Sequence, residues 1–332
     1  MYRLLDLPPF ALELCRRLGA NPKSLELLQG GMNSQVFRFK AGSHWHVIKG
    51  FSSRPTTGHD RLKAEVELLN YAQMVAPEFV PRLLHIDEES RSVVLEYIEG
   101  ERFEAGRAPS SESVGQAIAF MRRLNEDYEI ARQYVSGSAA DGFLRLTKHL
   151  ENIDQRLRLM DVEHVPDGSK RQAQRLIDEA RRRLTILQDC TEQLISEGYC
   201  ADALDPQERC ISPGDYGFHN AIRTPRGVKF FDFEFAGWDD PSKAVADFDL
   251  QPKVPVSPKR QALAGAIRTW NTRYAVRHKV LAPILKLKWA CIILGQLNPS
   301  RWAEITQIDP TQALEPLLQA KLQSAENYLF KD

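Results

Sequence analysis

The chain has 332 residues, of which 43% are hydrophobic and 27% charged, which is ordinary usage for a folded domain and argues against disorder. Forty-four basic residues balance forty-four acidic ones, so no net charge draws the protein to nucleic acid or to an anionic membrane. The length suits a large core and two lobes rather than one.

The five cysteines are scattered, and no Cys-x-x-Cys pair occurs among them. This pattern predicts reduced thiols in a cytoplasmic protein rather than a disulfide framework or a zinc site. The N-terminus, "MYRLLDLPPFALEL", is a poor signal peptide, and the longest apolar run, "WACIILGQL", is too short to cross a bilayer. We therefore expect a soluble cytoplasmic protein without membrane or nucleic-acid partners; its oligomeric state cannot be predicted from these features.

The N-terminal part, residues 1–100, has the patterns of a β-rich lobe. Residues 25–51 predict three strands separated by turns at Gly30-Gly31 and Gly42. A helix is expected over "DRLKAEVELLNYAQMV", followed by two strands near "RLLHIDEE" and "SVVLEYIEG". The polar segment 101–112 is interpreted as a linker.

The remainder, residues 101–332, is predicted to be a mainly helical lobe that carries a catalytic loop (211–220), a hairpin (220–234) and the acceptor site. In the clearest helix, one apolar stripe comprises Leu176, Ala180, Leu184, Leu187 and Leu194. Gly198 stands where a C-terminal cap belongs, and the run Arg181–Arg183 is expected on the solvated face.

The segment "ISPGDYGFHNAIRTPRGVKFFDFE", residues 211–234, concentrates polar residues around a predicted hairpin. Pro225 and Gly227 favour a tight turn, which brings Asn220 opposite Phe231 or Asp232. A carboxamide and a carboxylate at one end of a hairpin are ligands that suit Mg²⁺, which seldom takes an all-protein cage. Asp215 is near enough to act as a free base on a hydroxyl. The alternative is a surface hairpin with incidental polar residues.

Further upstream, "HVIKGF" is predicted to be a strand in which Val47 and Lys49 share one face. A lysine facing inward is costly unless it is paired. The next helix supplies Glu65 as the partner, with Glu67 as the second choice because it lies about 200° further round. The alternative is an exposed lysine and a solvated glutamate. Neither a G-x-x-x-x-G-K-[ST] loop nor a G-x-G-x-x-G turn is present.

These motifs occur in the order of a protein-kinase-like fold, and the chain resembles the aminoglycoside phosphotransferase and choline-kinase-type family over residues 20–250. "LQGGMNSQVFRF" is similar to its nucleotide loop. "SPGDYGFHN" is similar to its His-Gly-Asp-x4-Asn catalytic loop, and "FFDFEFAGWDDP" to its Ile-Asp-Trp-Glu…Gly-Asp-Pro segment. The resemblance implies an α+β, bilobal kinase fold with a small antiparallel β-rich N-lobe and a larger, mainly helical C-lobe.

The resemblance also implies roles for individual residues. Asp215 is the expected catalytic base, and Asn220 and Asp232 are the expected Mg²⁺ ligands. Lys49 is expected to contact the phosphates of ATP or GTP, with Glu65 as its ion-pair partner. The other expected nucleotide contacts are the loop residues Gly30, Gly31, Asn33 and Ser34, the connection from Glu96 to Ile98 beside the adenine, and the apolar walls Val36, Val47 and Phe231.

The chain departs from the family pattern at two places. Pro213 stands where the family has a histidine two residues before the base, and "ADF" at Asp247 comes later than the family's Asp-Leu-Ala. No substrate role is therefore carried over to Asp239 or Asp247, and Asp240 is expected to be a turn or cap residue. His219 is expected to pack within the loop rather than bind a metal, because no second histidine is near.

The function predicted from the sequence is a kinase that uses ATP or GTP and Mg²⁺ to phosphorylate a hydroxyl of a small molecule, such as an aminoglycoside, a sugar or an amino alcohol. Pro213 motivates an alternative, a kinase-like module that binds nucleotide or ligand with little or no transfer activity. A protein kinase is less favoured, because the chain has no Ala-Pro-Glu signature and no long activation segment after Asp232.

Overall fold

In the computed structural model of the chain, the described residues are 8–28, 34–51, 58–256, 263–267, 272–308 and 314–330. They fall into two compact units. Unit 1 comprises Met1–Gly142, Cys210–Asp239 and Pro252–Arg268, and unit 2 comprises Phe143–Arg209, Asp240–Gln251 and Thr269–Asp332. Each unit combines segments from different parts of the chain, so the two units do not correspond to the two expected lobes. The lobe boundary expected at residue 100 therefore stays a prediction.

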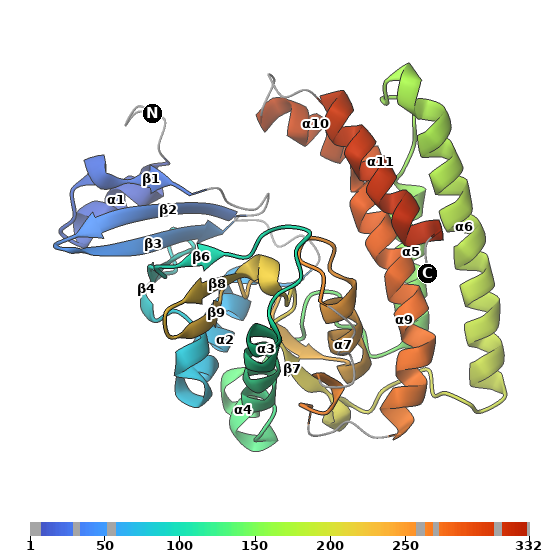
Figure 1. Ribbon diagram of the computed structural model, residues 1–332, viewed down its shortest axis with the longest axis horizontal. Coiled ribbons are helices and arrows are strands. Elements are labelled where there is room, and N and C mark those ends of the chain that lie inside the picture. The colour runs from blue at the N-terminus through green and yellow to red at the C-terminus, as the bar shows by residue number, and fades with distance from the viewer. Residues whose placement is uncertain are drawn as a thin grey trace. The chain divides into compact units, whose positions relative to one another are not determined.

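Unit 1 is built on a five-stranded antiparallel sheet with the strand order β1-β2-β3-β5-β4 (Figure 1). Its strands are β1 (Glu26–Leu27), β2 (Ser34–Ala41), β3 (His44–Phe51), β4 (Leu83–Asp87) and β5 (Ser92–Glu96). All five strands predicted for the N-terminal part are confirmed. Gly42 has a φ of +61° in the turn between β2 and β3, a conformation that favours glycine.

The two faces of this sheet carry different residues: one packs on a helix, and the other carries Lys49. Phe37, Phe39, Ile48 and Val94 form a core with helix α1 (Pro9–Arg17), which covers one face. Lys49 lies in register with Val36 on β2 and Val93 on β5, each one residue out of phase with that core. Because side chains alternate along a strand, the sequence that buries the α1 face also directs Lys49 and its neighbours to the opposite face.

The other elements of unit 1 are short strands and three helices. They are α2 (Arg61–Val75), β6 (Glu101–Arg102), α3 (Ser111–Leu124), α4 (Tyr128–Tyr134), β7 (Cys210–Ser212), β8 (Ala221–Thr224), β9 (Gly227–Phe230) and β10 (Gly237–Asp239). The interpretation of 101–112 as a linker is wrong at its start, because β6 pairs with β8. That pairing joins segments 120 residues apart, so local sequence contains no signal for it.

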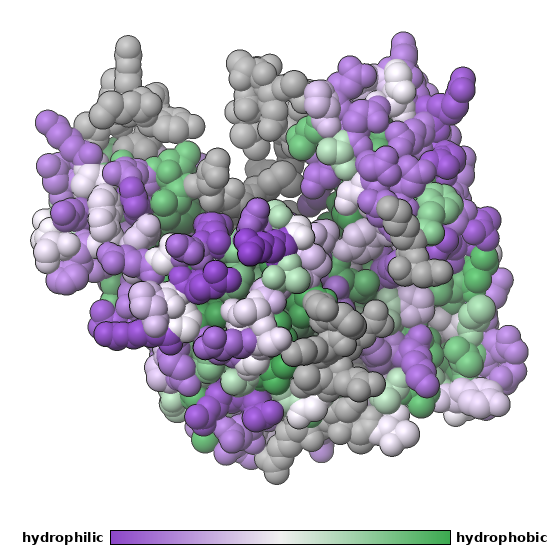
Figure 2. Space-filling view, viewed as in Figure 1, coloured by the Kyte–Doolittle hydropathy of each residue, from purple (hydrophilic) through white to green (hydrophobic). Residues whose placement is uncertain are grey.

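Unit 2 is helical, as predicted for most of its sequence. Its helices are α5 (Leu146–Arg158), α6 (Asp167–Ser196), α7 (Pro241–Leu250), α9 (Thr272–Ile293), α10 (Pro299–Ile308) and α11 (Leu314–Phe330). Figure 1 shows α5, α6, α9 and α11 side by side, and their buried aliphatic residues form one core. The predicted α6 stripe is buried at Leu176, Ala180 and Leu184, while the surface over α6 is mostly hydrophilic (Figure 2).

Two predicted features of α6 are confirmed at single residues. Gly198 has a φ of +74° directly after the helix, and its N–H bonds the carbonyl of Ile195. Arg181 and Arg182 are exposed, and they pair with Asp178 and Glu179 one turn earlier.

Within the described residues, one helical stretch, 272–297, is long and apolar enough to cross a membrane by composition. It contains the run "WACIILGQL", and 56% of its most apolar window is buried inside the protein. Burial of this kind is what a core helix shows, and the same residues contribute to the core of unit 2.

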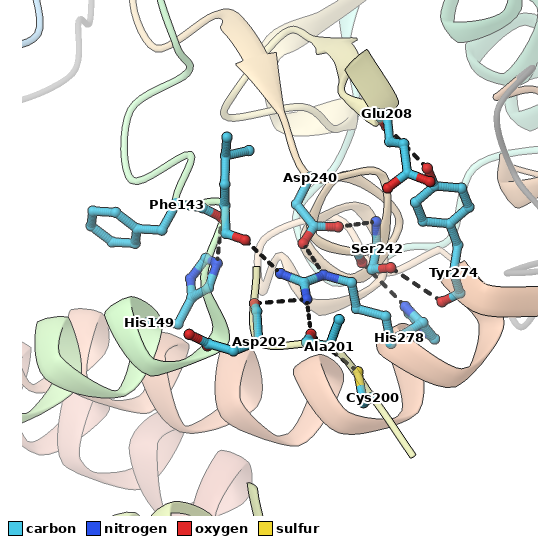
Figure 3. Close-up of polar contacts among 12 residues, drawn as sticks. Phe143, His149, Cys200, Ala201, Asp202, Glu208, Asp240, Ser242, Tyr274 and His278 are labelled. Atoms are coloured by element: carbon cyan, nitrogen blue, oxygen red, sulfur yellow. Dashed lines mark hydrogen bonds and ion pairs between the residues drawn. The ribbon is translucent and has the colours of Figure 1, made fainter. Parts of the chain in front are cut away.

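A buried ion pair organises one end of unit 2. Asp240 and Arg277 are almost completely buried, and their carboxylate and guanidinium lie 2.6 Å apart. Asp240 also accepts a hydrogen bond from the N–H of Ser242, which caps the N-terminus of α7 as predicted. The remaining nitrogens of Arg277 donate to the carbonyls of Leu144, Ala201 and Asp202 (Figure 3). One side chain thus connects α9, α7 and two loops.

Replacing Arg277 by methionine should cost about 3–5 kcal/mol of unfolding free energy, because it removes the cation paired with the buried Asp240 carboxylate and the donor to three carbonyls. Urea unfolding monitored by circular dichroism measures the change. Arg181→Met, which breaks the exposed pair with Asp178, is the matched control and should have almost no effect. Equal stability of the two variants would contradict this role for Arg277.

Candidate active site

Lys49 is the centre of a buried charge cluster in unit 1. Its side chain is 5% exposed, and its ammonium lies 2.8 Å from Glu65, 2.5 Å from Asp232 and 3.4 Å from Glu234. Burial alone would lower the pKa of Lys49, but the three carboxylates, with Asp232 foremost, outweigh it and raise that pKa above its usual value. Lys49 is therefore held as a cation.

The Lys49–Glu65 ion pair predicted from the sequence is present. Helix α2 begins after Asp60, whose carboxylate caps it by accepting from the N–H of Lys63, and Glu65 follows one turn later with no exposed surface. Glu67, the second choice, instead accepts hydrogen bonds from the N–H and hydroxyl of Ser136. The helical phase separates the two glutamates, so only Glu65 faces the sheet.

This cluster has one ammonium and three carboxylates. Among the described residues, Oε1 of Glu65 is buried without a hydrogen-bond partner, while Oε2 of Glu234 has only its 3.4 Å contact with the Lys49 ammonium. Burial raises the pKa of Glu65 to about 7, and burial also raises the pKa of Glu234. Carboxyl groups with pKa values shifted in this way by burial and by neighbouring charges cluster at functional sites.

The loop that carries Asp215 is shaped by a glycine. β7 ends at Ser212, and Gly214 then has a φ of +82°. A Cβ at Gly214 would lie 2.4 Å from the carbonyl oxygen of Phe235, so no other residue fits without displacing the backbone. The chain can therefore pass closely beneath the Asp232–Phe235 segment just before Asp215.

Asp215 is bonded by two residues that follow it in the loop. Its Oδ1 lies 3.0 Å from Nε2 of His219, and Nδ2 of Asn220 donates to its Oδ2 at 3.3 Å and to its main-chain oxygen at 3.0 Å. Burial opposes ionisation of Asp215, but His219, the charge of Lys253 and Asn220 outweigh it, and the pKa of Asp215 lies below its usual value. Asp215 is an ionised, oriented carboxylate.

The hairpin predicted around Pro225 and Gly227 is present, and it sets the position of Asn220. β8 and β9 pair Ala221 with Phe230, and the N–H of Phe231 donates to the carbonyl of Asn220. Asp232, the next residue, has a φ of +68°, a strained conformation for a residue with a side chain. The strain is retained where the Asp232 carboxylate contacts Lys49.

The nucleotide residues implied by the resemblance are placed as follows. Val36 and Val47 lie on the same face of the sheet as Lys49, and Ser34 begins β2. Glu96 ends β5 and forms an ion pair with Lys229, and Ile98 follows it in the chain. The guanidinium of Arg102 stacks over Phe231 at 5.4 Å. Gly30, Gly31 and Asn33 lie outside the described residues.

The metal ligands implied by the resemblance are both polar and partly exposed. The amide nitrogen of Asn220 is committed to Asp215, which makes its oxygen the atom suited to a cation. In the part of the chain that the structure describes, no three His, Cys, Asp or Glu side chains group as a metal site. A cation at Asn220 and Asp232 would need water or phosphate oxygens to complete its coordination, and Mg²⁺ in proteins is commonly bound in this way.

Two contacts of this arrangement were not predicted from the sequence, although His219 was expected to pack in the loop. Glu234 follows Asp232 by two positions, and although the backbone of Asp232 is left-handed rather than extended, both carboxylates lie beside Lys49. His219 follows Asp215 by four positions, as on a helical turn, and it contacts the carboxylate as well as packing in the loop. Both spacings were visible signals, but neither identifies its partner.

Solved structures share this architecture over nearly the whole chain. A choline/ethanolamine kinase family protein from Mesorhizobium loti matches with a TM-score of 0.53 and 17% identity, covering 99% of this chain and 96% of its own. Spectinomycin phosphotransferase APH(9)-Ia, in complex with ADP and spectinomycin, matches with a TM-score of 0.60 and 11% identity (97% and 99% covered).

A third neighbour, choline kinase from Cryptosporidium parvum Iowa II, matches with a TM-score of 0.58 and 10% identity, covering 96% of this chain and 94% of its own. No protein-family model matches the sequence, and no curated protein matches it. The chain thus has the fold of the protein-kinase-like small-molecule phosphotransferases, as its sequence predicted, with an antiparallel β-sheet N-lobe and a helical C-lobe.

The raised pKa of Glu65 predicts a pH-dependent stability in the absence of divalent cations. The folded pKa of about 7 exceeds the ordinary 4.5, so the stabilisation is complete below pH 4.5 and is lost as the pH rises towards 7. Glu65→Gln mimics the protonated form and should flatten the fall in unfolding free energy over this window. Urea unfolding between pH 4.5 and 7.5 in EDTA measures it.

Glu67→Gln removes a carboxylate from the same helix outside the cluster and is the matched control for the loss of charge on α2. If Glu65→Gln and the wild type have parallel profiles, Glu65 does not take up a proton on folding.

Proposed function

We propose that the protein is a Mg²⁺-dependent phosphotransferase that moves the γ-phosphoryl group of ATP or GTP to a hydroxyl of a small molecule. The observation that carries the proposal is that unit 1 holds both parts of this chemistry. Lys49 is buried against Glu65 and Asp232, and Asp215 is oriented by Asn220. The fold is shared with small-molecule kinases, one of them in complex with ADP, which supports nucleotide as the donor.

Lys49 would bind the nucleotide phosphates. Its ammonium is kept charged by its carboxylate partners, and Glu65 holds it on the side of the sheet lined by Val36 and Val47. The two valines would contact the base, and the main chain from Glu96 to Ile98 would meet its polar edge. Ser34 would contact the phosphates, as would Gly30, Gly31 and Asn33, which lie outside the described residues.

Asn220 and Asp232 would hold Mg²⁺, with the amide oxygen of one and the carboxylate of the other as ligands. When bound, the ion would neutralise charge on the phosphates during transfer. The donor set fits this ion, because both side chains offer oxygen and a buried oxygen of the adjacent Lys49 cluster, Oε1 of Glu65, has no hydrogen-bond partner among the described residues.

Asp215 would orient the acceptor hydroxyl and accept its proton as the new O–P bond forms. The long 3.3 Å bond from Asn220 leaves Oδ2 as the more available oxygen for that proton. No covalent intermediate with the protein is required, so positioning and charge neutralisation account for the catalysis.

The acceptor is proposed as a soluble molecule with a hydroxyl, of the aminoglycoside, sugar or amino-alcohol type. The neighbours named for choline, ethanolamine and spectinomycin support this breadth. We place the protein in the cytoplasm, where its cysteines stay reduced; all five are free thiols, four of them buried. Screening hydroxylated metabolites for release of ADP would identify the acceptor.

Pro213 favours a second candidate, a nucleotide-binding module with little transfer activity. The retained base, metal ligands and lysine argue against it, since a module that only binds has no need of all four residues. Mg²⁺-dependent hydrolysis of ATP without acceptor separates the two candidates, because it requires the base.

Asp215→Asn should reduce kcat by about 10²–10⁴-fold, because the amide keeps the shape of the side chain but cannot accept the proton. Affinity for Mg-ATP should change by less than about threefold. Coupled-assay kinetics and calorimetric titration measure the two quantities. A comparable loss of nucleotide affinity would instead make Asp215 a ligand or a structural residue.

Asp232→Ala should weaken ATP binding by roughly tenfold or more in the presence of Mg²⁺. In EDTA the variant should bind ATP no more weakly than the wild type, because the lost carboxylate acts through the ion. Titration of ATP under both conditions gives the comparison, and an equal loss in both would remove Asp232 from the set of ligands.

A further inference from the structure

His219 contacts the proposed base, and neither the sequence motif nor the proposed reaction gives this contact a role. Its ring is 8% exposed, and its Nε2 lies 3.0 Å from Oδ1 of Asp215. Its other nitrogen, Nδ1, is buried without a hydrogen-bond partner. Among the described residues, the proposed base is therefore the one side-chain partner of the ring, and the other ring nitrogen is left unsatisfied.

The backbone around His219 is built to hold the ring in this place. Phe218 has no exposed surface and packs on Phe103 and Phe230, with ring centroids 4.8 Å and 6.0 Å away. On the other side, the N–H of Asn220 donates to the carbonyl of Gly217 and closes the 3₁₀ turn Phe218–Asn220. Anchored on both sides, the turn presents His219 to the residue four positions earlier.

The chemistry of the pair assigns the hydrogen. An ionised carboxylate only accepts hydrogen bonds, so Nε2 of His219 must carry the hydrogen and donate it to Oδ1 of Asp215. This bond is shorter than the 3.3 Å contact from Asn220 to Oδ2. His219 thus holds one carboxylate oxygen firmly, and the second oxygen stays available for the acceptor's proton.

Pro213, two residues before the base, cannot supply a side-chain donor. It occupies the position at which the resembling family has histidine, and its buried side chain has no group that can donate a hydrogen bond. The loop therefore lacks a donor two residues before the base and has one four residues after it.

We propose that His219 is a positioning residue of Asp215 and supplies a side-chain donor to Oδ1 while Asn220 donates to Oδ2. The inference rests on the proposed function, in which Asp215 is the base. His219 acts through Asp215, so its loss lowers kcat and leaves nucleotide binding, which involves Lys49 and Asp232, unchanged.

The test compares His219→Leu, which removes the donor, with His219→Gln, whose amide nitrogen can occupy the position of Nε2. Mg²⁺-dependent ATP hydrolysis is the assay, and calorimetric titration of Mg-ATP monitors binding. His219→Leu should lower kcat about tenfold or more with Mg-ATP affinity within about twofold, and His219→Gln should recover most of the rate. His85→Leu, an exposed histidine of β4, is the matched control.

Two outcomes would overturn the proposal. Equal rates in His219→Leu and wild type would show that the contact between His219 and Asp215 does not contribute to catalysis. Equal losses of rate and nucleotide affinity in both His219 variants would show that the ring is only a packing element. In the Asp215→Asn background, His219→Leu should cause no further loss, because the residue it positions no longer functions.

A measurement that does not depend on turnover separates this proposal from the proposed function. Long-range ¹H–¹⁵N spectra of the ¹⁵N-labelled full chain report which imidazole nitrogen carries hydrogen. Hydrogen on Nε2 of His219, its signal shifted in Asp215→Asn, supports the contact, and hydrogen on Nδ1 alone overturns it. A wild type that neither binds nor hydrolyses Mg-ATP would defeat the proposed function, while the tautomer would still decide the His219–Asp215 bond.

Discussion

Burial of the Lys49 ammonium is the constraint on which the rest of unit 1 depends. A buried cation is costly unless carboxylates surround it, and Glu65, Asp232 and Glu234 converge on it from one helix and one loop far apart in the sequence. Because Glu65 must face Lys49, the rotation of α2 about its axis relative to the sheet is fixed. Lys49 also holds the Asp232–Phe235 segment, beneath which Gly214 and the Asp215 loop pass.

The same constraint connects stability to function. Three carboxylates exceed what one ammonium needs. Burial raises the pKa values of Glu65 and Glu234, and Oε1 of Glu65 has no hydrogen-bond partner among the described residues. A protein selected only for stability would replace such a cluster by apolar residues of similar volume. Asp232 also has a left-handed backbone, which is strained for a residue with a side chain. Strained residues of this kind cluster at active sites.

Local sequence was sufficient for much of the fold. Period-two alternation predicted the sheet, the apolar stripe and Gly198 predicted α6 and its end, and Pro225 with Gly227 predicted the hairpin. Prediction failed where the pairing is remote: β6 joins β8 across 120 residues, and Arg277 reaches Asp240 and three carbonyls on other segments. Such partners are chosen by packing, which no window of sequence contains.

The candidate site divides in the same way. The sequence by itself determined the residue types, their order and their spacing, because hydroxyl phosphorylation with Mg²⁺ needs a base, oxygen ligands and a paired lysine, and each is encoded by a short motif. Only the tertiary structure decided that Asp232 and Glu234 join Lys49 and its predicted partner Glu65, and that His219 contacts the base. The physical reason is that these choices depend on distances of a few ångströms between segments whose relative positions are set by the whole core.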